Sequence, residues 1–477
     1  MRKHYERILH DSESRVQRYL DIQILDENSP FCGGFPKADS LAEPKTAIYR
    51  ATTMTACYLN PESSYYLDAE LGRRLALALA FVRRSQRPGG YFDLINCNFF
   101  SGPDTAFCTK RLLPAYVYLC KVVDGALPAA PEAKAAAAEL KPKYEAIIRD
   151  AADALCHCGF HTPNHRWAIA SVLMLCAKLF DKPECRTAAE AILKEGNDCN
   201  EDGEYAERSA GNYNRINNDA MIMLSEATGD ASYEQYAIRN LRMMLTYWEP
   251  DGSVFTANST RFDKDRLIYP KDYYMEYLKM GMKYEISEFL QMCNTIFDIV
   301  DRKQITSPDF LIWFMLHPEY RKLEYDEKYC RPDFARFYQE SGIARTQQGR
   351  LTYTVMNGKS NFFYLHNGTM KLELKVAGSF CEHRAFKSET MERLSEKEYH
   401  LKQIMRGWYY LPFAEKPGTS DWWKMDNASR EKKLGPDMEI NVWVKEAEHG
   451  VDVRVKTSGV EGAPWRIELA FSGVSYL

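Results

Sequence analysis

The stretch Trp167–Phe180 reads WAIASVLMLCAKLF and is apolar on nearly every side of a helix. A helix without a polar face is surrounded by other elements. The preceding helical stretch, Pro131–Asp153, carries Lys, Glu and Arg along one side, as expected of a helix with one face in solvent. Inner and outer helices therefore alternate, which predicts an α/α toroid, either a complete or an incomplete ring.

Glycine followed closely by an aromatic residue recurs through the first two thirds of the chain, at spacings of roughly 45 to 70 residues, enough for two helices and their loops. The pairs are Gly34-Phe35, Gly90-Tyr91, Gly159-Phe160, Gly203-Tyr205 and Gly252-Phe255. Helical periodicity occupies Ala69–Arg84, Thr105–Val122, Pro131–Cys156, Asn214–Thr228, Ser232–Trp248 and Tyr284–Val300. Loops at one end of a toroid converge, so we expect the glycine-aromatic loops to line a central groove.

The periodicity changes after a charged stretch that begins near residue 318. Short β-rich runs follow, several with the apolar and polar alternation of half-buried antiparallel strands. They are Leu351–Met356, Asn361–Leu365, Met370–Val376, Met438–Val444, Val451–Val455 and Trp465–Phe471. The sequence thus predicts an α+β multidomain chain, with an (α/α) toroid over 1–317, a linker over 318–350 and an antiparallel β-sandwich-like domain over 351–477 that is reduced or lacks strands.

Composition excludes several classes of partner. The 477 residues are enough for two domains, and 62 basic against 66 acidic residues give a net charge of −4. This balance provides no global attraction to nucleic acid or anionic membranes, so an acidic ligand must be met by a local basic cleft. The chain has no run of about 18 apolar residues, a polar amino terminus and 13 scattered cysteines. We therefore expect a cytoplasmic protein with reduced thiols.

Two motifs carry the chemistry. Asn164 and His165 stand side by side ahead of the apolar helix. The block Asp-Gly-x-x-x-Glu-x-Ser-x-x-x-Tyr follows over residues 202–213 and ends at Tyr213. Together they indicate an amide, an imidazole and a phenol gathered at one cleft, which is equipment for removing a proton from a carbon next to a carboxylate.

The order of toroid and β-sandwich, with these two motifs, resembles the heparinase II/III-like polysaccharide lyases and their alginate lyase relatives. The resemblance implies β-elimination on uronate-containing poly- or oligosaccharides, of the glycosaminoglycan or the alginate type. In those lyases the C5 proton of a uronate is removed and the O4 leaving group is expelled, which leaves an unsaturated sugar. The expected partner is therefore an acidic saccharide, and no cofactor is required.

The same resemblance assigns roles to three residues. Asn164 stabilises the negative charge that spreads into the carboxylate, which a positioned hydrogen-bond donor can do without a metal. His165 is a base or a second carboxylate contact. Tyr213 protonates the leaving oxygen and, in a syn elimination, also removes the C5 proton. A basic tyrosine needs a pKa below the usual value of about 10, for which neighbouring arginines are candidates.

Further residues are expected to contact the substrate. Aromatic rings suit the apolar faces of pyranoses, and guanidinium groups match planar oxyanions. The candidates in the toroid are Tyr91, Asp104, Tyr205, Glu207, Arg208 and Arg261. The resemblance also implies a histidine from the β domain at the cleft, and the candidates there are His366, His383 and the adjacent Arg384.

Each site residue also has a structural interpretation. Asn164 follows a proline at the start of a helix, so it could be an N-cap. A single histidine such as His165 is more often a partly buried, hydrogen-bonded residue than a catalyst, and a single tyrosine is more often core or groove lining. Asp104 or Thr105 could cap the helix that follows residues 98–103.

Two clusters match metal sites only in part. Asp198, Asn200 and Asp202 begin like a calcium loop, but Ser209 stands where a bidentate Glu belongs. The cluster over residues 156–158, Cys-His-Cys, has no zinc-module spacing. The resemblance allows a structural divalent metal in the β domain, but closely spaced His and Asp ligands for it are not evident. We therefore expect no metal site.

Two rival functions stay open at this point. An unsaturated glucuronyl hydrolase also uses a helical toroid, and it would make Asp104 or Asp202 essential and Tyr213 dispensable. A carbohydrate-binding toroid without activity would bind saccharides without turnover. The sequence leaves open the polymer, its sulfation, endo or exo action and the oligomeric state.

Overall fold

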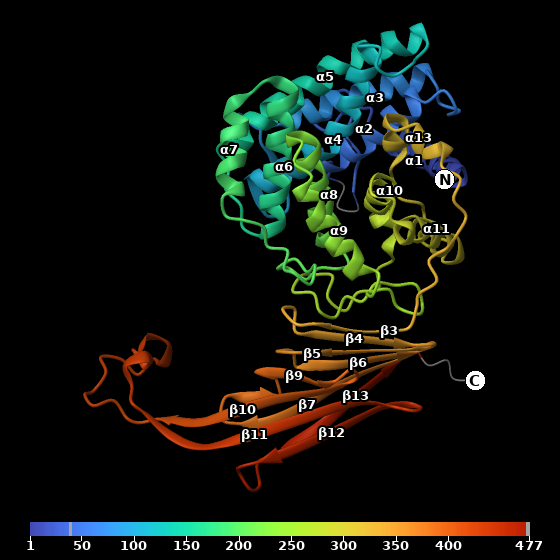
Figure 1. The fold of residues 1–477 in the computed structure, drawn as a ribbon. Coiled ribbons are helices and arrows are strands. Elements are labelled where there is room, and N and C mark those ends of the chain that lie inside the picture. The colour runs from blue at the N-terminus through green and yellow to red at the C-terminus, as the bar shows by residue number, and fades with distance from the viewer. Residues whose placement is uncertain (38–40, 474–477) are drawn as a thin grey trace. The chain divides into compact units, whose positions relative to one another are not determined.

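The computed structural model describes residues 1–37 and 41–473 and divides the chain into two compact units (Figure 1). The helical unit comprises Met1–Cys199, Gly203–Met244 and Ser259–Cys330. The sheet unit comprises Asn200–Asp202, Leu245–Asn258 and Arg331–Leu477. Two short segments from the first two thirds of the chain thus belong to the sheet unit. Hydrophobic periodicity does not reveal them, because Asn200–Asp202 is too short for a strand pattern and Leu245–Asn258 forms only the isolated bridge between Trp248 and Val254.

The helical unit is built from helix pairs. Its helices are α1 Arg2–Ile22, α2 Pro44–Leu59, α3 Ala69–Ser85, α4 Gly102–Val123, α5 Pro131–Leu155, α6 Pro163–Phe180, α7 Pro183–Leu193, α8 Tyr213–Thr228, α9 Ser232–Met244, α10 Tyr274–Lys283, α11 Ser287–Arg302, α12 Leu311–Leu316 and α13 Glu319–Lys322. Helices α2, α4, α6 and α8 contact one another in succession, and each also packs against the helix that follows it in sequence. This alternation of inner and outer helices confirms the predicted α/α toroid (Figure 1).

Helix α6 contains the stretch that predicted an inner helix. Trp167 is 1% exposed, and its indole nitrogen donates to Asp198 at 2.5 Å. The helix begins at Pro163, where a missing N–H costs nothing, and Thr162 occupies the N-cap position. Asn164 therefore lies inside the first turn, and its interpretation as an N-cap is wrong.

The start of α4 also differs from the sequence expectation. The helix begins at Gly102, and the Ser101 hydroxyl caps it by accepting a hydrogen bond from the Asp104 backbone N–H at 3.2 Å. The Ser101 hydroxyl also donates to the Asp104 carboxylate at 2.8 Å. The cap is thus Ser101, because its hydroxyl accepts from a backbone N–H of the first turn that has no partner within the helix.

The sheet unit is an antiparallel β-sandwich. Its strands are β3 Phe334–Tyr338, β4 Ile343–Gln348, β5 Leu351–Met356, β6 Asn361–Asn367, β7 Met370–Phe380, β8 His383–Ala385, β9 Thr390–Ser395, β10 Glu398–Tyr410, β11 Lys432–Ala447, β12 Gly450–Ser458 and β13 Trp465–Ser472. One sheet has the order β13-β7-β6-β5-β4-β3 with β8 beside β7, and the other has the order β12-β11-β10-β9. Val355 and Val376 from the first sheet share one core cluster with Leu401 and Ile440 from the second.

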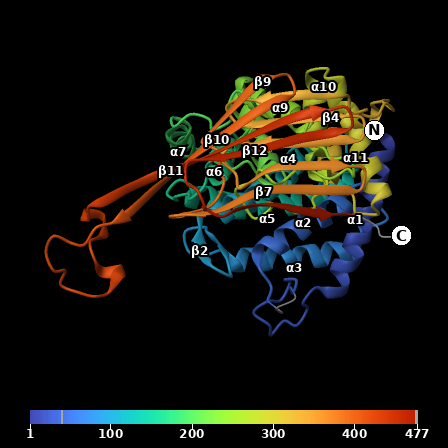
Figure 2. The same cartoon turned by 90° about the horizontal axis from the view of Figure 1, so that it is seen from below.

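Strands β10 and β11 form a long antiparallel ribbon that runs beside β12 (Figure 2). The ribbon carries the loop 411–431 at its end, where Trp423 is 90% exposed. All six predicted β runs lie inside observed strands. The predicted antiparallel β-sandwich after the toroid is therefore confirmed.

Two strands, β3 and β4, lie inside the range 318–350 that the sequence analysis assigned to a linker. Strand β4 escapes pattern analysis because its buried side chains include Arg345, Thr346 and Gln347. The charged connection is shorter than expected, since α13 ends at Lys322 and β3 begins at Phe334. Short strands β1 Phe92–Leu94 and β2 Asn98–Ser101 also pair within the helical unit.

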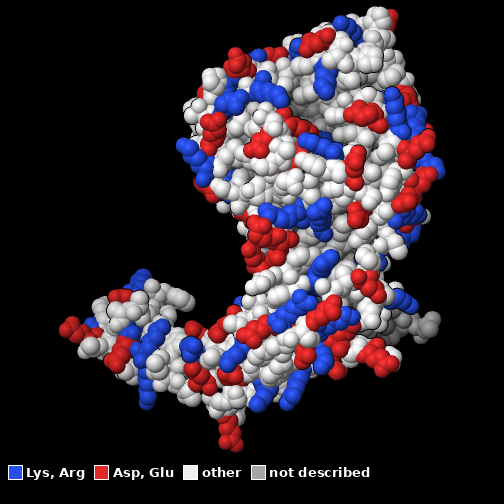
Figure 3. Space-filling model, viewed as in Figure 1, with Lys and Arg blue, Asp and Glu red and all other residues white. Residues whose placement is uncertain are grey.

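The surface agrees with the balanced composition of the chain. Basic and acidic side chains are interspersed over the face of the helical unit that Figure 3 presents. Among the described residues, no helix combines the length and the apolar character that a membrane crossing requires.

Candidate active site

A cavity of about 380 Å³ lies within the helical unit. Inner helices supply most of its wall, which combines aromatic rings with charges of both signs. Its lining residues are Lys45, Tyr49, Phe107, Lys110, Arg111, Pro114, Asn212, Tyr213, Arg215, Ile216, Asp219, Phe262, Asp272, Met275, Glu276, Phe310 and Trp313. The cavity is large enough for part of a saccharide, and it contains Tyr213 from the second sequence motif.

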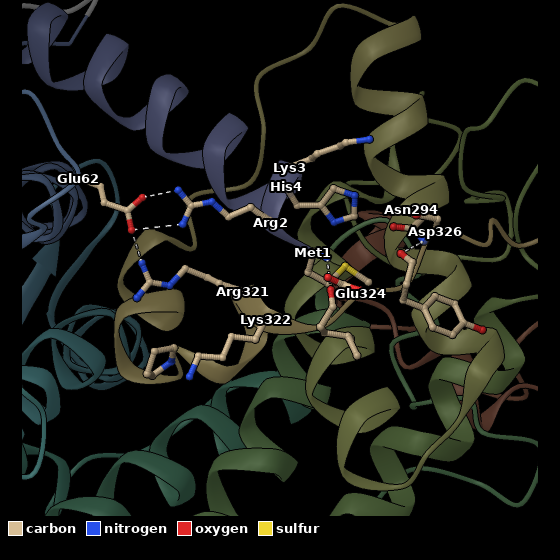
Figure 4. A pocket seen from close by; sticks show the side chains of 13 residues that line it. Met1, Arg2, Lys3, His4, Glu62, Asn294, Arg321, Lys322, Glu324 and Asp326 are labelled. Carbon is tan, nitrogen blue, oxygen red and sulfur yellow. Dashed lines mark hydrogen bonds and ion pairs between the residues drawn. The ribbon is translucent and has the colours of Figure 1, made fainter.

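A larger cavity, of about 640 Å³, lies at the start of α1 (Figure 4). Its two arginines are paired, because Glu62 bridges Arg2 at 2.6 Å and Arg321 at 2.7 Å. The amino group of Met1 donates to the Leu323 carbonyl at 2.5 Å. None of the site residues predicted from sequence lines this cavity. The smaller cavity, which contains Tyr213, is therefore the candidate active site.

Tyr213 is the first residue of α8 and is half-buried at the cavity wall. Its ring packs edge-on against Phe262, with 5.8 Å between ring centroids. The guanidinium carbon of Arg261 lies 5.2 Å from the centroid of the Tyr213 ring. A cation is thus held over the ring of Tyr213, although Arg261 itself is not among the residues that line the cavity.

Asp263 holds the two loops that meet at Tyr213. Its carboxylate is fully buried and accepts hydrogen bonds from the hydroxyls of Ser209 and Ser259, at 2.8 and 2.6 Å, and from the Gly211 N–H at 2.9 Å. The Ser209 hydroxyl in turn accepts from the Tyr213 N–H at 3.0 Å. Sequence reasoning missed Asp263, because Ser209 and Gly211 are 54 and 52 residues away and nothing in its neighbourhood marks it.

Asn164 and Glu207 form a buried pair behind this wall. The Asn164 amide nitrogen donates to both carboxylate oxygens of Glu207, at 2.9 and 2.8 Å, and the Asn164 backbone N–H donates at 3.1 Å. Burial raises the pKa of Glu207 above its ordinary value, although Asn164 and Arg261 oppose the shift. The Oε1 atom of Glu207, which accepts from the Asn164 amide, also lies 3.3 Å from Nε of Arg261. A continuous chain of polar contacts therefore links Asn164 to the cation beside Tyr213.

His165 lies beside Phe107, with ring centroids 5.9 Å apart, and Phe107 lines the cavity. Burial lowers the pKa of His165 to about 4, with Asp104 acting in the opposite direction. Its Nδ1 atom is buried and has no hydrogen-bond partner among the described residues. The imidazole is consequently neutral near pH 7 and has an unused nitrogen.

Replacing His165 with Gln should reduce the loss of stability in mild acid. The folded chain resists protonation of His165 until about pH 4, whereas the unfolded chain takes up the proton near 6.5, so the unfolded state binds more protons between these values. The free energy of unfolding therefore falls as the pH drops from 6.5 to about 4. Urea unfolding of both proteins across the window measures the effect, and identical pH dependence would contradict it.

The remaining candidates in the helical unit are placed less favourably. Tyr205 is fully buried, and its phenol donates to Asn218 at 3.1 Å, so its expected contact with sugar disagrees with the structure. Asp104 forms an ion pair with Lys45 at 3.0 Å, and Lys45 lines the cavity. Tyr91 is half-buried against Phe100, and Arg208 pairs with Glu204 at 3.4 Å; neither of these two candidates lines the cavity.

Three of the five glycine-aromatic pairs have a structural role. The rings of Phe35, Tyr205 and Phe255 are buried in the cores of their units. Gly203 has a φ of +97°, and a Cβ there would lie 2.5 Å from the Arg239 carbonyl oxygen, so the turn requires glycine. Gly203 thus permits a tight turn, and the aromatic residues of three pairs fill the core, whereas Tyr91 and Phe160 are half-buried.

The candidates in the sheet unit differ in environment. His366 is 5% exposed, its Nδ1 lies 2.7 Å from a Glu249 carboxylate oxygen, and its Nε2 has no hydrogen-bond partner among the described residues. His383 is half-buried and Arg384 is exposed, both on the short strand β8. His366 alone is therefore held in a defined orientation by a carboxylate.

The partial metal motifs have other partners in the structure. The second carboxylate oxygen of Asp198 accepts from the Ala206 N–H at 3.1 Å, and Asp202 accepts from the Ser341 N–H at 2.8 Å. In the described residues, no group of three or more His, Cys, Asp or Glu side chains is arranged to hold a metal ion. Cys156 instead lies 3.5 Å from Cys185 as a free thiol pair.

Comparison with known proteins supports the fold and leaves the sequence without a match. No protein-family model and no curated protein sequence matches the chain. Heparinase III is similar in structure, with a TM-score of 0.51 and 10% identity over 98% of this chain and 85% of that one. Xanthan lyase from Paenibacillus has a TM-score of 0.52 and 8% identity over 98% of this chain and 57% of that one.

Chondroitin AC lyase from Streptomyces coelicolor A3, in a complex with chondroitin sulphate, is similar at a TM-score of 0.50 and 10% identity. The match covers 99% of this chain and 80% of that one. Each similarity extends over nearly the whole chain, so it includes the helices and the sheets alike. At such low identity these similarities show a polysaccharide lyase-like fold, and function must be argued from the residues of this chain.

Proposed function

We propose that this protein is a polysaccharide lyase that cleaves uronate-containing poly- or oligosaccharides by β-elimination. The observation that carries the proposal is the Arg261 guanidinium held over the Tyr213 ring at the wall of a cavity. A phenol and a cation at one point supply an acid for a leaving oxygen and a partner for a carboxylate. The lyase-like fold supports the same proposed function.

In the proposed reaction, Arg261 binds the uronate carboxylate, and its charge stabilises the electron density that enters that group when the C5 proton leaves. A base removes the C5 proton, and the electron pair of the C–H bond forms the C4–C5 double bond. The C4–O4 bond breaks, and O4 takes a proton from the Tyr213 phenol. The base is the neutral His165, or the Tyr213 phenolate in a syn elimination.

His165 suits the role of base because it is neutral before the substrate binds. A uronate carboxylate nearby would raise the pKa of the imidazole, since an opposite charge favours the protonated form. The buried Nδ1 atom of His165 has no hydrogen-bond partner among the described residues, so no hydrogen bond to Nδ1 has to break before this atom accepts a proton. Binding of an anionic sugar would therefore bring the imidazole closer to the pKa that proton transfer requires.

Asn164 acts in this proposal through Glu207. Its amide is committed to the Glu207 carboxylate, and that carboxylate faces Arg261. Asn164 is also fully buried. It is thus a positioning residue that orients Glu207, which differs from the direct contact with the uronate carboxylate that the resemblance implies.

The test is an assay for the unsaturated uronate product. The protein is incubated with a panel of glycosaminoglycan, alginate and other uronate polymers and their oligosaccharides, and the ultraviolet absorbance of the conjugated product is followed. We expect absorbance to rise with one class of substrate. Loss of absorbance from pre-made unsaturated oligosaccharides would instead indicate a glucuronyl hydrolase, and binding without either change would indicate a carbohydrate-binding toroid.

A further inference from the structure

Three carboxyl groups line the cavity that contains Tyr213, those of Asp219, Asp272 and Glu276, and Asp219 and Glu276 have unlike partners. Asp219 on α8 forms an ion pair with Lys110 on α4 at 3.0 Å, and Lys110 also donates to the Ile216 carbonyl at 2.9 Å. Glu276 lies in the first turn of α10 and is 5% exposed. Sequence reasoning singled out neither residue.

Glu276 has an unused oxygen. Its Oε2 atom is buried and has no hydrogen-bond partner among the described residues, although the side chain lines the cavity. A buried polar atom without a partner costs free energy, so native structures rarely leave one unless a ligand or water completes it. The position of this carboxyl therefore suits a polar group that occupies the cavity.

The charges around Glu276 decide its protonation state. Burial raises the pKa of Glu276 to about 8, Asp219 adds to the shift, and Arg215 and Lys110 oppose it. Although burial works against ionisation of Asp219 as well, Lys110 and Lys279 hold the pKa of Asp219 below its ordinary value. The other titratable groups close to Glu276 are Asp272 and Tyr273 on the 3₁₀ turn before α10, Tyr277 on α10 and Cys293 on α11.

We propose that Glu276 is a specificity-determining residue, whose Oε2 group hydrogen-bonds an oxygen of the uronate sugar held in this cavity. The proposal rests on the proposed function and adds a contact that the elimination itself does not use. Protonated Glu276 donates to a ring hydroxyl or carboxylate oxygen of the sugar. Lys110 and Arg215 at the same wall favour an anionic sugar over a neutral one.

The contact makes binding depend on pH. Below the raised pKa, Glu276 is neutral and can donate a hydrogen bond. As the pH rises through this value, Glu276 ionises beside Asp219, loses its donor and repels the carboxylate of the sugar. Affinity for a uronate oligosaccharide should therefore fall on the alkaline side, and affinity for a neutral oligosaccharide should fall less.

The experiment is calorimetric titration of the full chain with the uronate oligosaccharide that binds best in the panel, on both sides of about pH 8. Tyr213→Phe is present in every sample so that turnover does not interfere. Glu276→Gln keeps a neutral donor, so its affinity should match the parent at the lower pH and lose the alkaline decline. Glu276→Leu should weaken binding about tenfold at the lower pH.

Glu139→Gln serves as the matched control, because Glu139 pairs with Lys143 on the surface of α5 and does not line the cavity. It should bind like the parent at each pH, and circular dichroism verifies that each variant is folded. Unchanged affinity of both Glu276 variants at both pH values would overturn the inference. Binding that follows the expected pattern in a protein without lyase activity would leave the inference standing and reject the proposed function instead.

Discussion

Replacing Tyr213 with Phe should lower kcat/KM for β-elimination by about 10²- to 10⁴-fold, the usual contribution of a positioned general acid or base. The variant loses one oxygen and keeps the ring that packs against Phe262 and Arg261. Affinity for the oligosaccharide and thermal stability should therefore change little. Steady-state kinetics, calorimetric binding and thermal unfolding of the same preparation measure the three quantities.

Tyr236→Phe is the matched control for this prediction. Tyr236 also has an arginine near its ring, with the guanidinium carbon of Arg239 5.4 Å from the ring centroid, but it does not line the cavity. The control should retain activity close to that of the parent. A Tyr213→Phe enzyme with full activity would remove the phenol from the mechanism, and loss of activity in Asp104→Asn or Asp202→Asn instead would favour the hydrolase.

Replacing Glu249 with Ala should destabilise the sheet unit by about 3–5 kcal/mol, the range for breaking a buried ion pair. Glu249 accepts from Nη2 of Arg345 at 2.7 Å, and the Arg345 side chain is completely buried. The variant would leave this guanidinium without its carboxylate and would free the Nδ1 atom of His366. Urea unfolding followed by circular dichroism in the β-sheet region measures the change.

The Glu249 prediction has its own control and a pH signature. Asp437→Ala removes an exposed ion pair with Arg406 and should cost at most about 1 kcal/mol. Although burial opposes ionisation, Arg345 and His366 lower the pKa of Glu249 to about 2. The ionised Glu249 carboxylate therefore contributes to the free energy of unfolding above its ordinary pKa of 4.5, and this contribution is lost as the pH falls toward 2. Equal acid sensitivity of the parent and Glu249→Ala would contradict the assignment.

The fold was predictable where burial and side-chain pattern agree. Helix α6 is apolar all round and is an inner helix of the toroid, and the strand run Leu351–Met356 coincides with β5. Pattern analysis failed where a buried element is polar. Strand β4 buries Arg345 because Glu249 neutralises it, and a partner 96 residues away leaves no trace in local sequence.

The candidate site was predictable in part for a similar reason. The motifs pointed to Tyr213 and His165, and the structure places Tyr213 at the cavity and His165 beside a residue that lines it. Tyr205 belongs to the same motif, yet it is buried in the core. Neighbours along a turn point in different directions, so a motif selects candidates without deciding which side chain reaches the cavity.

Local sequence patterns encode the alternation of inner and outer helices, the antiparallel strands that follow and the residue types available for elimination. These depend on periodic burial, which nearby residues record. Three features arise only from the folded arrangement. Asp263 ties together the loops around Tyr213, Asn164 reaches Arg261 through Glu207, and Glu276 keeps an oxygen without a partner among the described residues at the cavity wall. Hydrogen bonds and pKa values depend on distances between groups far apart in the chain, and folding alone sets those distances.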